Sequence, residues 1–429
     1  MDSTRIAAER CRRAFYRISS LPIDVRDRAL GQVAKELTRH EEAIVDANRK
    51  DLEEAERNQL SSPLLKRLKY DGMKIDESVR QVEALIMQED PIGRVLSRME
   101  LDEGLVLEKV SCPIGVIGIV FESRPDALVQ ISTLCIKSGN AVLLKGGSEA
   151  KRTNEILAKV IQGAITQVDA CFEDAVHLLS TREEFRALLV LDDLVDLIIP
   201  RGSNELVRSI QNSTKIPVLG HAAGICHTYV HEDADLELAV RVCYDAKVQY
   251  PAVCNAMETL LVNGKVAGTF LPLMAKEYGE AKVVMRGDEA TRRIIPVDEA
   301  TEDDWTAEYN DLVLSIKVVG SMQEAVDHIN HYGSHHTDAI ITRNEATARR
   351  FMDLVDSSSV MCNCSTRFAD GYRYGLGAEV GISTSKTHAR GPVGLEGLTI
   401  YKWRLFGKGQ VVADYAGQGA KGFTHRKLS

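Results

Sequence analysis

The sequence lacks the features that identify several classes of protein. No segment approaches the roughly 18 apolar residues of a membrane-spanning helix, and the first residues alternate charged with apolar side chains instead of forming the apolar centre of a signal peptide. Positive charge is not in excess, because the formal net charge is −9 at pH 7 and the Lys and Arg residues are scattered. This balance predicts a protein without a nucleic-acid surface and without a membrane segment.

A disulfide framework is also absent. The nine cysteines are an odd number and lack framework spacing, which predicts reduced thiols and a cytoplasmic location. Cys362 and Cys364 alternate like strand residues in VMCNC, so packing in a strand is favoured over metal binding.

The chain of 429 residues is too long for one hydrophobic core, so two or three domains are expected. Residues 1 to about 90 have helical spacing, and 95–113 form two alternating runs around a turn, which indicates a β-hairpin. From residue 115 strands alternate with helices, including a helix from Pro125 and a capping box from Thr181 to Glu184. A second region of this kind follows Tyr229. The predicted fold class is α/β with a doubly wound parallel sheet.

Two loops lie where open parallel sheets bind ligands, between a strand end and a helix start. In LKGGSEA, two glycines allow close approach, Lys145 supplies charge, and Ser148 is placed to cap the helix; in PRGSNEL, Arg201, Gly202 and Ser203 precede a helix. Neither loop has the G-x-G-x-x-G fingerprint. Phosphate binding and an ordinary strand–helix turn therefore both remain open for each loop.

The histidines do not form a recognised metal motif. His331, His335 and His336 in INHYGSHHTDAI match no compact zinc spacing and have no nearby Cys pair. His221 and His227 in LGHAAGICH are similar, and structural or substrate-contact roles are favoured over ligation. We therefore predict no metal.

Cys254 lies in QYPAVCNAME, a loop between a helical stretch and the apolar run TLLV. A free cysteine is most often a small buried apolar residue. The neighbouring Pro251 and Asn255 place this one outside the apolar run, as for a nucleophile. Both interpretations remain open from the spacing alone.

The chain resembles the γ-glutamyl phosphate reductase family of the aldehyde dehydrogenase superfamily in a series of motifs that covers nearly its whole length, in the family's order: GVIGIVFESRPD, LKGGSEA, LIIPRGSN, VCNAMETLLV, NHYGSHHTDAI, STRFADGYRYGLGAEVGIST and THARGPVGLEGLT. The resemblance implies an aldehyde dehydrogenase-like fold. It also implies NADPH-dependent reduction of L-glutamate 5-phosphate to L-glutamate 5-semialdehyde, in proline biosynthesis.

The resemblance also implies a domain plan. Residues 1–94, 113–229 and about 366–390 would form the NADPH-binding domain, and residues 230–365 the catalytic domain. Residues 95–112 and 391–429 would form a small β element for oligomerisation, so at least a homodimer is expected. An association with glutamate 5-kinase is a further hypothesis, because the acyl phosphate cyclises readily.

Cys254 matches the family's catalytic cysteine, which would form a thioester and release phosphate. Candidate donors to the oxyanion are the Cys254 backbone N–H and the side chains of Asn255 and Ser123. Hydrolytic aldehyde dehydrogenases carry a glutamate before Leu-Gly-Gly, whereas residues 217–221 here read PVLGH. That absence argues against the alternative of a hydrolytic NAD(P)-dependent aldehyde dehydrogenase. A second alternative is a non-catalytic scaffold of the same fold, and the presence of Cys254 with both loops argues against it.

The remaining site residues are also implied by the resemblance. Near the cofactor it places Lys145, Gly147, Ser148, Arg201, Gly202, Ser203 and Glu308. Ser148 stands where NAD-using relatives often have a ribose-binding glutamate, which favours NADPH. For the substrate the candidates are Arg124, His221, Ser365, Thr366 and Arg367, with a structural salt bridge as the alternative role of each arginine. Cys364 replaces the family's usual alanine.

Overall fold

The computed structural model describes residues 3–221 and 223–428, and this part of the chain begins with helices. They are α1 (Ser3–Ile18), α2 (Ile23–Arg39), α3 (Glu41–Arg57), α4 (Ser62–Leu68) and α5 (Gly72–Ile86). Apolar residues on one face of α1, α2 and α5 are buried in the core of the first lobe. The helical spacing predicted for this region is confirmed.

The first lobe is built on a parallel sheet with the strand order β5-β4-β3-β6. Its elements are β3 (Val116–Phe121), α6 (Pro125–Lys137), β4 (Ala141–Gly146), η1 (Ser148–Ala150), α7 (Lys151–Val168), η2 (Ala170–Phe172), β5 (Val176–Leu178), α8 (Arg182–Leu188), β6 (Leu197–Arg201) and α9 (Asn204–Gln211). Every residue of β3 and β4 is buried. Their continuous apolar runs are typical of strands covered on both faces.

The second lobe holds a larger parallel sheet with the order β10-β9-β11-β8-β7-β12-β13. Its elements are β7 (Cys226–Val230), α10 (Leu236–Val248), β8 (Met257–Asn263), α11 (Gly264–Glu280), β9 (Val284–Gly287), α12 (Glu289–Arg292), β10 (Asp298–Glu299), η3 (Glu302–Thr306), β11 (Val313–Val319), α13 (Met322–Tyr332), β12 (Thr337–Ile341), α14 (Glu345–Leu354) and β13 (Ser359–Cys362). The lobe has cores of its own.

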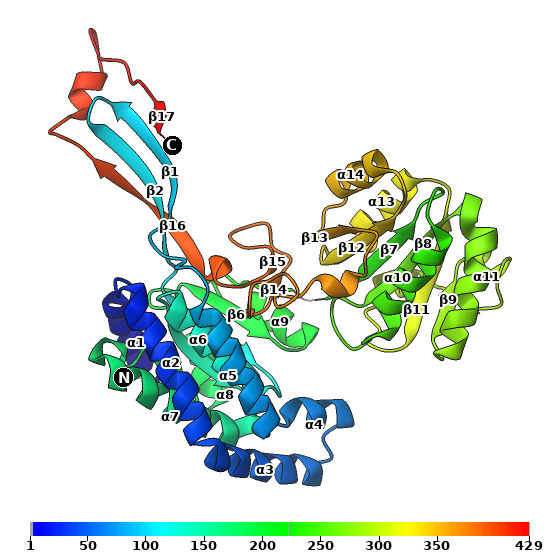
Figure 1. The fold of residues 1–429 in the computed structure, drawn as a ribbon, viewed down its shortest axis with the longest axis horizontal. Coiled ribbons are helices and arrows are strands. Elements are labelled where there is room, and N and C mark those ends of the chain that lie inside the picture. The colour runs from blue at the N-terminus through cyan, green and yellow to red at the C-terminus, as the bar shows by residue number, and fades with distance from the viewer. Residues whose placement is uncertain (1–2, 222, 429) are drawn as a thin grey trace.

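A narrow arm projects from the first lobe (Figure 1). It is an antiparallel sheet of β16 (Thr399–Phe406), β2 (Leu105–Pro113), β1 (Val95–Asp102) and β17 (Arg426–Leu428), in that order. The predicted hairpin is thus confirmed, and Gly104 takes a φ of +70° at its turn. Large apolar side chains on the arm are exposed, among them Tyr401, Trp403 and Phe406.

The chain returns from the second lobe to the arm through short elements between the lobes (Figure 1). These are η4 (Thr366–Phe368), β14 (Ile382–Ser383), β15 (Gly391–Pro392) and η5 (Glu396–Leu398), while η6 (Val412–Tyr415) lies near the arm's tip. Val380, Val393 and Leu398 pack into the first-lobe core. None of the helices described here has the length and apolar character needed to cross a bilayer.

The predicted α/β class with parallel sheets is confirmed, and so are most local signals. Pro125 opens α6, and Thr181 and Glu184 form the capping box of α8. One expectation was wrong. Ser148 does not cap the following helix, because it is the first residue of η1 and the N-cap positions of η1 and α7 are Gly147 and Ala150.

Candidate active site

Cys254 lies in the loop between α10 and β8, at the amino edge of the second sheet, and it is half-buried. Cys226 fixes this loop, because its buried thiol donates to the Cys254 carbonyl oxygen at 3.2 Å. Burial raises the pKa of Cys226 well above that of an ordinary thiol, so the group keeps its proton. A Cβ at Gly224 would lie 2.5 Å from Cys254 Cα, so this close approach requires glycine. Contacts of the Cys254 backbone therefore fix this loop, and the Cys254 thiol takes no part in them.

Two imidazoles stand beside this thiol. One ring nitrogen of His221, one of His336 and the Cys254 sulfur lie within 4.8 Å of one another, and the two ring centroids are 5.0 Å apart. His221 Nδ1 is 3.0 Å from the Ile382 carbonyl oxygen, and His336 Nδ1 is 2.9 Å from Thr337 Oγ1. His336 is fully buried, and its Nε2 has no partner among the described residues.

Two guanidiniums make the surroundings of Cys254 positive. Arg367, in η4, donates from Nε to Gln249 Oε1 at 3.0 Å, and Arg201, at the end of β6, donates to the Glu379 carbonyl oxygen at 3.3 Å. Burial lowers the pKa of both groups, and attraction to Cys254 opposes that shift. The positive charge of both groups therefore acts at the Cys254 sulfur.

Asn255 ties the Cys254 loop to η4. Its Nδ2 donates to the Ala369 carbonyl oxygen at 2.8 Å, whereas its Oδ1 has no partner in the described structure. Thr366 Oγ1 is buried and likewise unpartnered, and Ser365 Oγ accepts from the Arg367 N–H at 3.3 Å. Residues 365–367, predicted as substrate contacts, are thus brought next to the Cys254 loop.

A buried ion pair supports the same loop from inside the second lobe. Lys247 at the end of α10 and Glu258 in β8 lie 2.5 Å apart, and both side chains are 0% exposed. Burial raises the pKa of Glu258 to about 7, with Lys247 opposing the shift, and burial lowers the pKa of Lys247. Since the pair flanks residues 249–256, it fixes both ends of the Cys254 loop.

The carboxyl edge of the first sheet carries the predicted cofactor residues. Lys145 pairs with Val120, and Arg201 with Phe121, so the ends of β4, β3 and β6 are level. Lys145 is buried and donates to the Gly146 carbonyl oxygen, whereas Ser148 is exposed. Burial lowers the pKa of Lys145, and Glu149 opposes the shift.

The carboxylates of Glu149 and Glu122 accept hydrogen bonds from donors at this edge. Glu149 Oε1 accepts from the backbone N–H and from Oγ of Ser123, the latter at 2.7 Å, and Ser123 has a φ of +45°. Glu122 Oε2 accepts from the Ser203 N–H at 3.1 Å. A Cβ at Gly147 or Gly202 would meet one of these carboxylates at 2.0 Å or 2.6 Å respectively. Ser123 therefore has its donors engaged.

The same edge fits a nicotinamide dinucleotide. A buried lysine, a guanidinium and the first turn of α9 offer positive charge and N–H donors to phosphates, and the glycines keep the backbone accessible. Binding there would displace the carboxylates of Glu122 and Glu149 from the donors that they now occupy.

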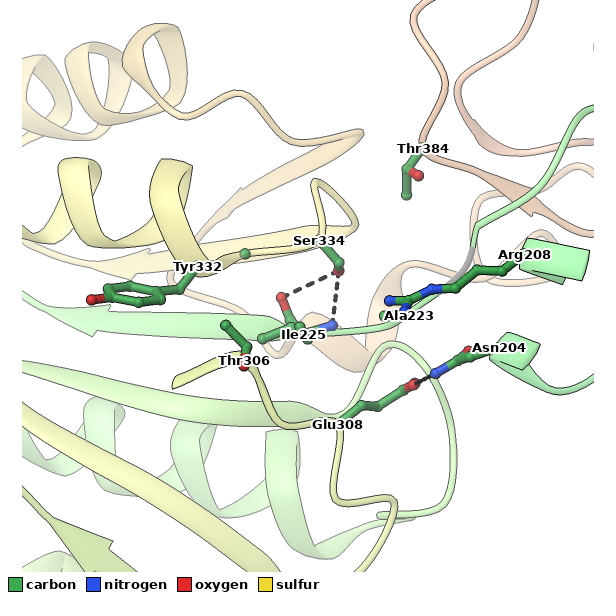
Figure 2. A pocket seen from close by; sticks show the side chains of 10 residues that line it. Asn204, Arg208, Ala223, Ile225, Thr306, Glu308, Tyr332, Ser334 and Thr384 are labelled. Atoms are coloured by element: carbon green, nitrogen blue, oxygen red, sulfur yellow. Dashed lines mark hydrogen bonds between the residues drawn. The ribbon is translucent and has the colours of Figure 1, made fainter. Parts of the chain in front are cut away.

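A cavity of about 600 Å³ lies between the lobes beside both edges (Figure 2). Asn204 on α9 donates to Glu308 Oε2 at 2.6 Å across it, and Glu308 precedes β11. Ala223 and Ile225 line the cavity on either side of Gly224, the residue packed against Cys254. The cavity thus connects the two sets of predicted residues. Arg124 stands apart from it, exposed at the N-cap of α6.

Several residues of this site carry no signal in the sequence for the contacts that they make. No motif shows that the carboxylates of Glu149 and Glu122 accept from Ser123 and Ser203. No motif gives a role to Gln249 or Cys226 either. The spacing groups His336 with His331 and His335 and not with Cys254. The sequence did contain one signal. Gly224 stands shortly before the buried strand β7, and a glycine at such a position often marks a close approach of two backbone segments.

Comparison with known proteins identifies what the chain is similar to. Residues 2–312 match the model of the aldehyde dehydrogenase family. The γ-glutamyl phosphate reductase of Pelotomaculum thermopropionicum is 57% identical over 429 residues, which is 100% of this chain and 98% of the relative. The γ-glutamyl phosphate reductase 1 of Synechocystis is 52% identical, covering 100% and 99%. The crystal structure of the γ-glutamyl phosphate reductase of Thermotoga maritima superposes with a TM-score of 0.93 at 39% identity, covering 96% of this chain and 100% of the other.

Proposed function

The chain belongs to the aldehyde dehydrogenase family and, within it, to the γ-glutamyl phosphate reductases, and from this premise we propose how it works. It reduces L-glutamate 5-phosphate to L-glutamate 5-semialdehyde and phosphate in proline biosynthesis. The observation that carries the mechanism is the half-buried thiol of Cys254 within range of the two guanidiniums of Arg201 and Arg367.

The Cys254 thiolate attacks the acyl carbon of the substrate. A carbon–sulfur bond forms, the carbon–oxygen bond to phosphate breaks, and inorganic phosphate leaves with that electron pair. A bound nicotinamide cofactor would supply hydride to the thioester carbon, and the resulting tetrahedral oxyanion would expel the Cys254 thiolate to give the aldehyde. Arg201 and Arg367 place positive charge beside the sulfur and attract the departing phosphate.

Donors beside Cys254 stabilise the oxyanion. One is the backbone N–H of Cys254, and the other is the Nδ2 group of Asn255, which is buried beside the nucleophile and has a second hydrogen besides the one that it donates to the Ala369 carbonyl oxygen. Ser123 joins them only after Glu149 releases its hydroxyl.

NADPH supplies the hydride, and members of this family use nicotinamide cofactors. Lys145, Gly147 and Ser148 hold its adenosine ribose, Arg201, Gly202 and Ser203 its pyrophosphate, and Glu308 its nicotinamide ribose. Ser148 is exposed and itself carries no charge that would repel a 2′-phosphate. The hydrogen bond from Asn204 to Glu308 supports the last assignment, because it fixes Glu308 at the cavity between the lobes.

The glutamyl part of the substrate binds beside η4. Arg367 takes an anionic group, Ser365 and the unpartnered Thr366 hydroxyl supply hydrogen bonds, and His221 lies at the thiol. Arg124 needs a rotation toward the cavity to reach the substrate, since it is exposed at the start of α6.

The two lobes support a division of the chain into domains. Residues 3–94, 113–225 and about 370–398 form the cofactor domain, and 226–369 the catalytic domain. These limits differ slightly from the sequence expectation, because β7 pairs within the second sheet, Ala369 packs with Ala339 and Met361, and Val393 to Leu398 pack in the first core. The arm, residues 95–112 and 399–428, serves oligomerisation.

The exposed apolar face of the arm supports a homo-oligomer, at least a dimer. Tyr401, Trp403 and Leu405 alternate along the regular strand β16 and so share one face, and they are 46%, 56% and 56% exposed. We assign the protein to the cytoplasm, where the nine free cysteines remain reduced.

Association with glutamate 5-kinase would shorten the path of a labile acyl phosphate. Co-sedimentation of the two proteins at micromolar concentration tests this, and separate sedimentation refutes it.

The test of the reaction runs it backwards. Purified protein is mixed with glutamate semialdehyde, in equilibrium with its cyclic form, and NADP⁺, and NADPH is followed with and without phosphate. Turnover should require phosphate and should fall at least about a thousandfold in Cys254→Ala. Cys112→Ala, a half-buried cysteine in the arm, is the matched control and should retain activity.

Other outcomes identify the alternatives. Turnover without phosphate would indicate the hydrolytic dehydrogenase. Against it stands the group of ligand-type side chains at Cys254, which among the described residues consists of His221 and His336 and includes no carboxylate. NADPH binding without turnover under any condition would indicate a non-catalytic scaffold.

A further inference from the structure

We propose that Cys254, His221 and His336 form a binding site for a thiophilic divalent cation, Zn²⁺ above all, and that its occupation reversibly blocks the enzyme. The binding part of this inference depends only on the geometry. The inhibitory part rests on the proposed role of Cys254 as the nucleophile.

The three ligand atoms converge from separate loops. They lie within 4.8 Å of one another, whereas ligand atoms around a tetrahedral zinc, with bonds of about 2.0–2.3 Å, are about 3.3–3.6 Å apart. The remaining approach is within reach of a side-chain rotation, because Cys254 and His221 are both half-buried and His221 precedes β7 on an irregular segment. A movement of one lobe relative to the other is therefore not needed to bring the three ligand atoms together.

Both imidazoles are oriented as metal ligands usually are. A ligating histidine commonly has its other ring nitrogen hydrogen bonded to a carbonyl or similar group, which fixes the tautomer and the ring. His221 Nδ1 faces the Ile382 carbonyl oxygen, and His336 Nδ1 faces Thr337 Oγ1. Each Nε2 is therefore the nitrogen left for a ligand.

His336 supplies an independent reason to expect a ligand. Its side chain is 0% exposed, and its Nε2 makes no hydrogen bond to any described residue. A buried ring nitrogen without a partner is costly, and a ligand that coordinates it removes that cost.

The donor set selects the kind of metal. One thiolate and two imidazoles suit Zn²⁺, Co²⁺ and Cu⁺, whereas Mg²⁺ and Ca²⁺ prefer oxygen ligands, and this cluster contains none. Three protein ligands leave a fourth position open to water or to a substrate oxygen.

Nearby charge limits the affinity. Arg201 and Arg367 interact with the Cys254 sulfur, so they oppose a divalent cation at the same point. The site should therefore release its metal to a chelator, unlike a structural zinc site. Replacing one of these arginines should tighten metal binding.

Coordination would stop the reaction at its first step. Cys254 releases its proton to solvent as the sulfur–metal bond forms, and the sulfur lone pair is then no longer available to the acyl carbon. Metal and acyl phosphate should compete, because both need the same sulfur.

The first experiment measures binding without using activity. Full-length protein is titrated with Co²⁺, and the thiolate-to-cobalt absorption is recorded. Zn²⁺ affinity is then measured by competition with a chromophoric chelator. We expect one ion per chain, displacement of Co²⁺ by Zn²⁺, and no competition from Mg²⁺.

Variants identify the ligands. Cys254→Ser should abolish the charge-transfer band, and His221→Asn and His336→Gln should each weaken Zn²⁺ binding at least about tenfold, the minimum seen when a metal site loses even an outer-shell partner. His331→Gln, an exposed neighbour, is the matched control and should bind as the unaltered chain does. Arg367→Met should bind Zn²⁺ several times more tightly. Because His336 is buried, His221→Asn carries the test if His336→Gln does not fold.

The outcomes separate the two parts of the proposal. A cobalt spectrum without thiolate character, or one unchanged in Cys254→Ser and His221→Asn, would overturn the site. Binding with those ligands but without loss of turnover would overturn the inhibition alone. Loss of turnover that EDTA restores, in step with site occupancy, would support both. A protein without reductase activity would still give the cobalt result.

Discussion

The two sides of the active site differ in how their polar groups are hydrogen bonded. In the first lobe, the donors at the cofactor edge are occupied by the chain's own carboxylates, Glu149 on Ser123 and Glu122 on Ser203. In the second lobe, polar atoms around the nucleophile have no partner in the described structure, namely Asn255 Oδ1, Thr366 Oγ1 and His336 Nε2.

This difference shows which half of the site already has free hydrogen-bonding atoms for a ligand. A buried polar atom without a partner costs free energy, so it is retained where a ligand will supply the missing contact. The second lobe is therefore arranged for substrate in advance, whereas the first lobe must exchange internal hydrogen bonds for those of its cofactor. Four experiments can break or sharpen this contrast.

The largest effect should come from the buried ion pairs. Glu258→Gln leaves Lys247 charged and fully buried, and should lower the free energy of unfolding by about 3–5 kcal/mol. In the first lobe, Lys137 is also fully buried, but its partner Asp27 is 23% exposed and Lys137 keeps the Ile86 carbonyl oxygen as an acceptor. Asp27→Asn should therefore cost less, about 1–2 kcal/mol. Urea unfolding measures both, and equal losses would contradict the contrast.

The next effect concerns the oxyanion. Asn255→Ala should lower kcat by a factor of about 100 to 1,000, as expected for one lost donor, and should leave the KM for NADPH unchanged. Asn255→Asp keeps the size of the side chain but removes its donor, so it should be no better. Steady-state kinetics decide. A full rescue by Asp would show that the side chain only fills space.

A smaller effect is the response of the second lobe to acid. Burial, with His227 and Lys317 adding to it, lowers the pKa of His328 to about 2, and neither ring nitrogen has a partner among the described residues. Folded His328 therefore stays neutral, while the unfolded chain binds a proton below its ordinary pKa of about 6.5. This group's contribution to stability is complete above that pH and falls as the pH is lowered, by about 1.4 kcal/mol per pH unit.

His328→Phe tests this sign. The ring would keep its packing against Trp305 and Tyr332 without a titratable nitrogen, so urea unfolding at pH 7 and at pH 5 should differ less than in the unaltered chain. In the first lobe, burial also lowers the pKa of His177, which is only half-buried. His177→Phe should change the acid response less, and an equal change would remove this difference between the lobes.

The smallest effect should be seen at the cofactor edge. Glu149→Gln removes a carboxylate that occupies the donors of Ser123 and lies near Lys145. The Kd for NADPH should fall about twofold to fivefold, and the Kd for NADH less, because a 2′-phosphate feels the lost negative charge most. Binding can be followed by nicotinamide fluorescence, with Glu56→Gln as an exposed control on α3. A larger gain for NADH would contradict the assignment of this loop.

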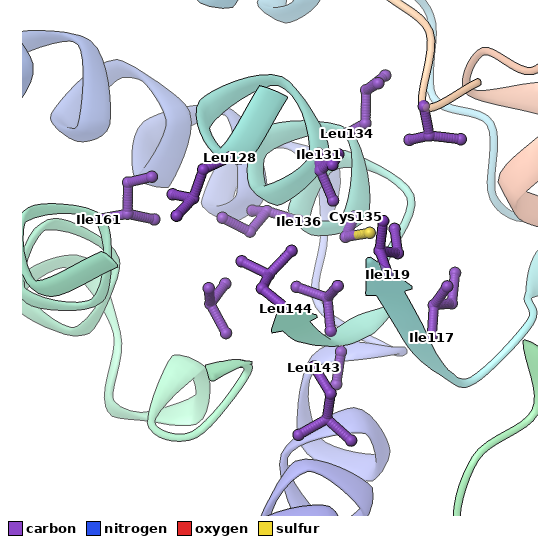
Figure 3. Packing of buried hydrophobic residues seen from close by; sticks show 14 of the residues in the cluster. Ile117, Ile119, Leu128, Ile131, Leu134, Cys135, Ile136, Leu143, Leu144 and Ile161 are labelled. Carbon is purple, nitrogen blue, oxygen red and sulfur yellow. The ribbon is translucent and has the colours of Figure 1, made fainter. Parts of the chain in front are cut away.

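Local patterns predicted much of the first lobe. Figure 3 shows Ile117, Ile119 and Leu144 of the two central strands on the side of the sheet that Leu128 and Ile131 of α6 cover, while Leu143 points to the other side. The continuous apolar runs of the strands and the proline at the start of α6 indicated this packing on both faces. These signals act over a few residues, so they survive without knowledge of the rest of the chain.

The assembly of the site was less accessible to such patterns. The rule that ligands bind at the carboxyl ends of parallel strands describes Lys145 and Arg201, but Cys254 and His336 lie before β8 and β12, at the amino edge of the other sheet. Their meeting with His221 depends on how the two lobes are joined. The family motif indicated Cys254, but no spacing along the chain could show its imidazole neighbours.

The arm has a consequence for the order in which the molecule is made. Strands β1 and β2 are synthesised early, but their outer partners β17 and β16 come from the last part of the chain. Pairing between such distant segments must wait until both exist. A growing chain therefore carries a hairpin with two open edges throughout synthesis of both lobes, and those edges can pair with a neighbouring nascent chain. Slow or interrupted translation before β16 should thus favour aggregation through the arm, even when both lobes have already folded.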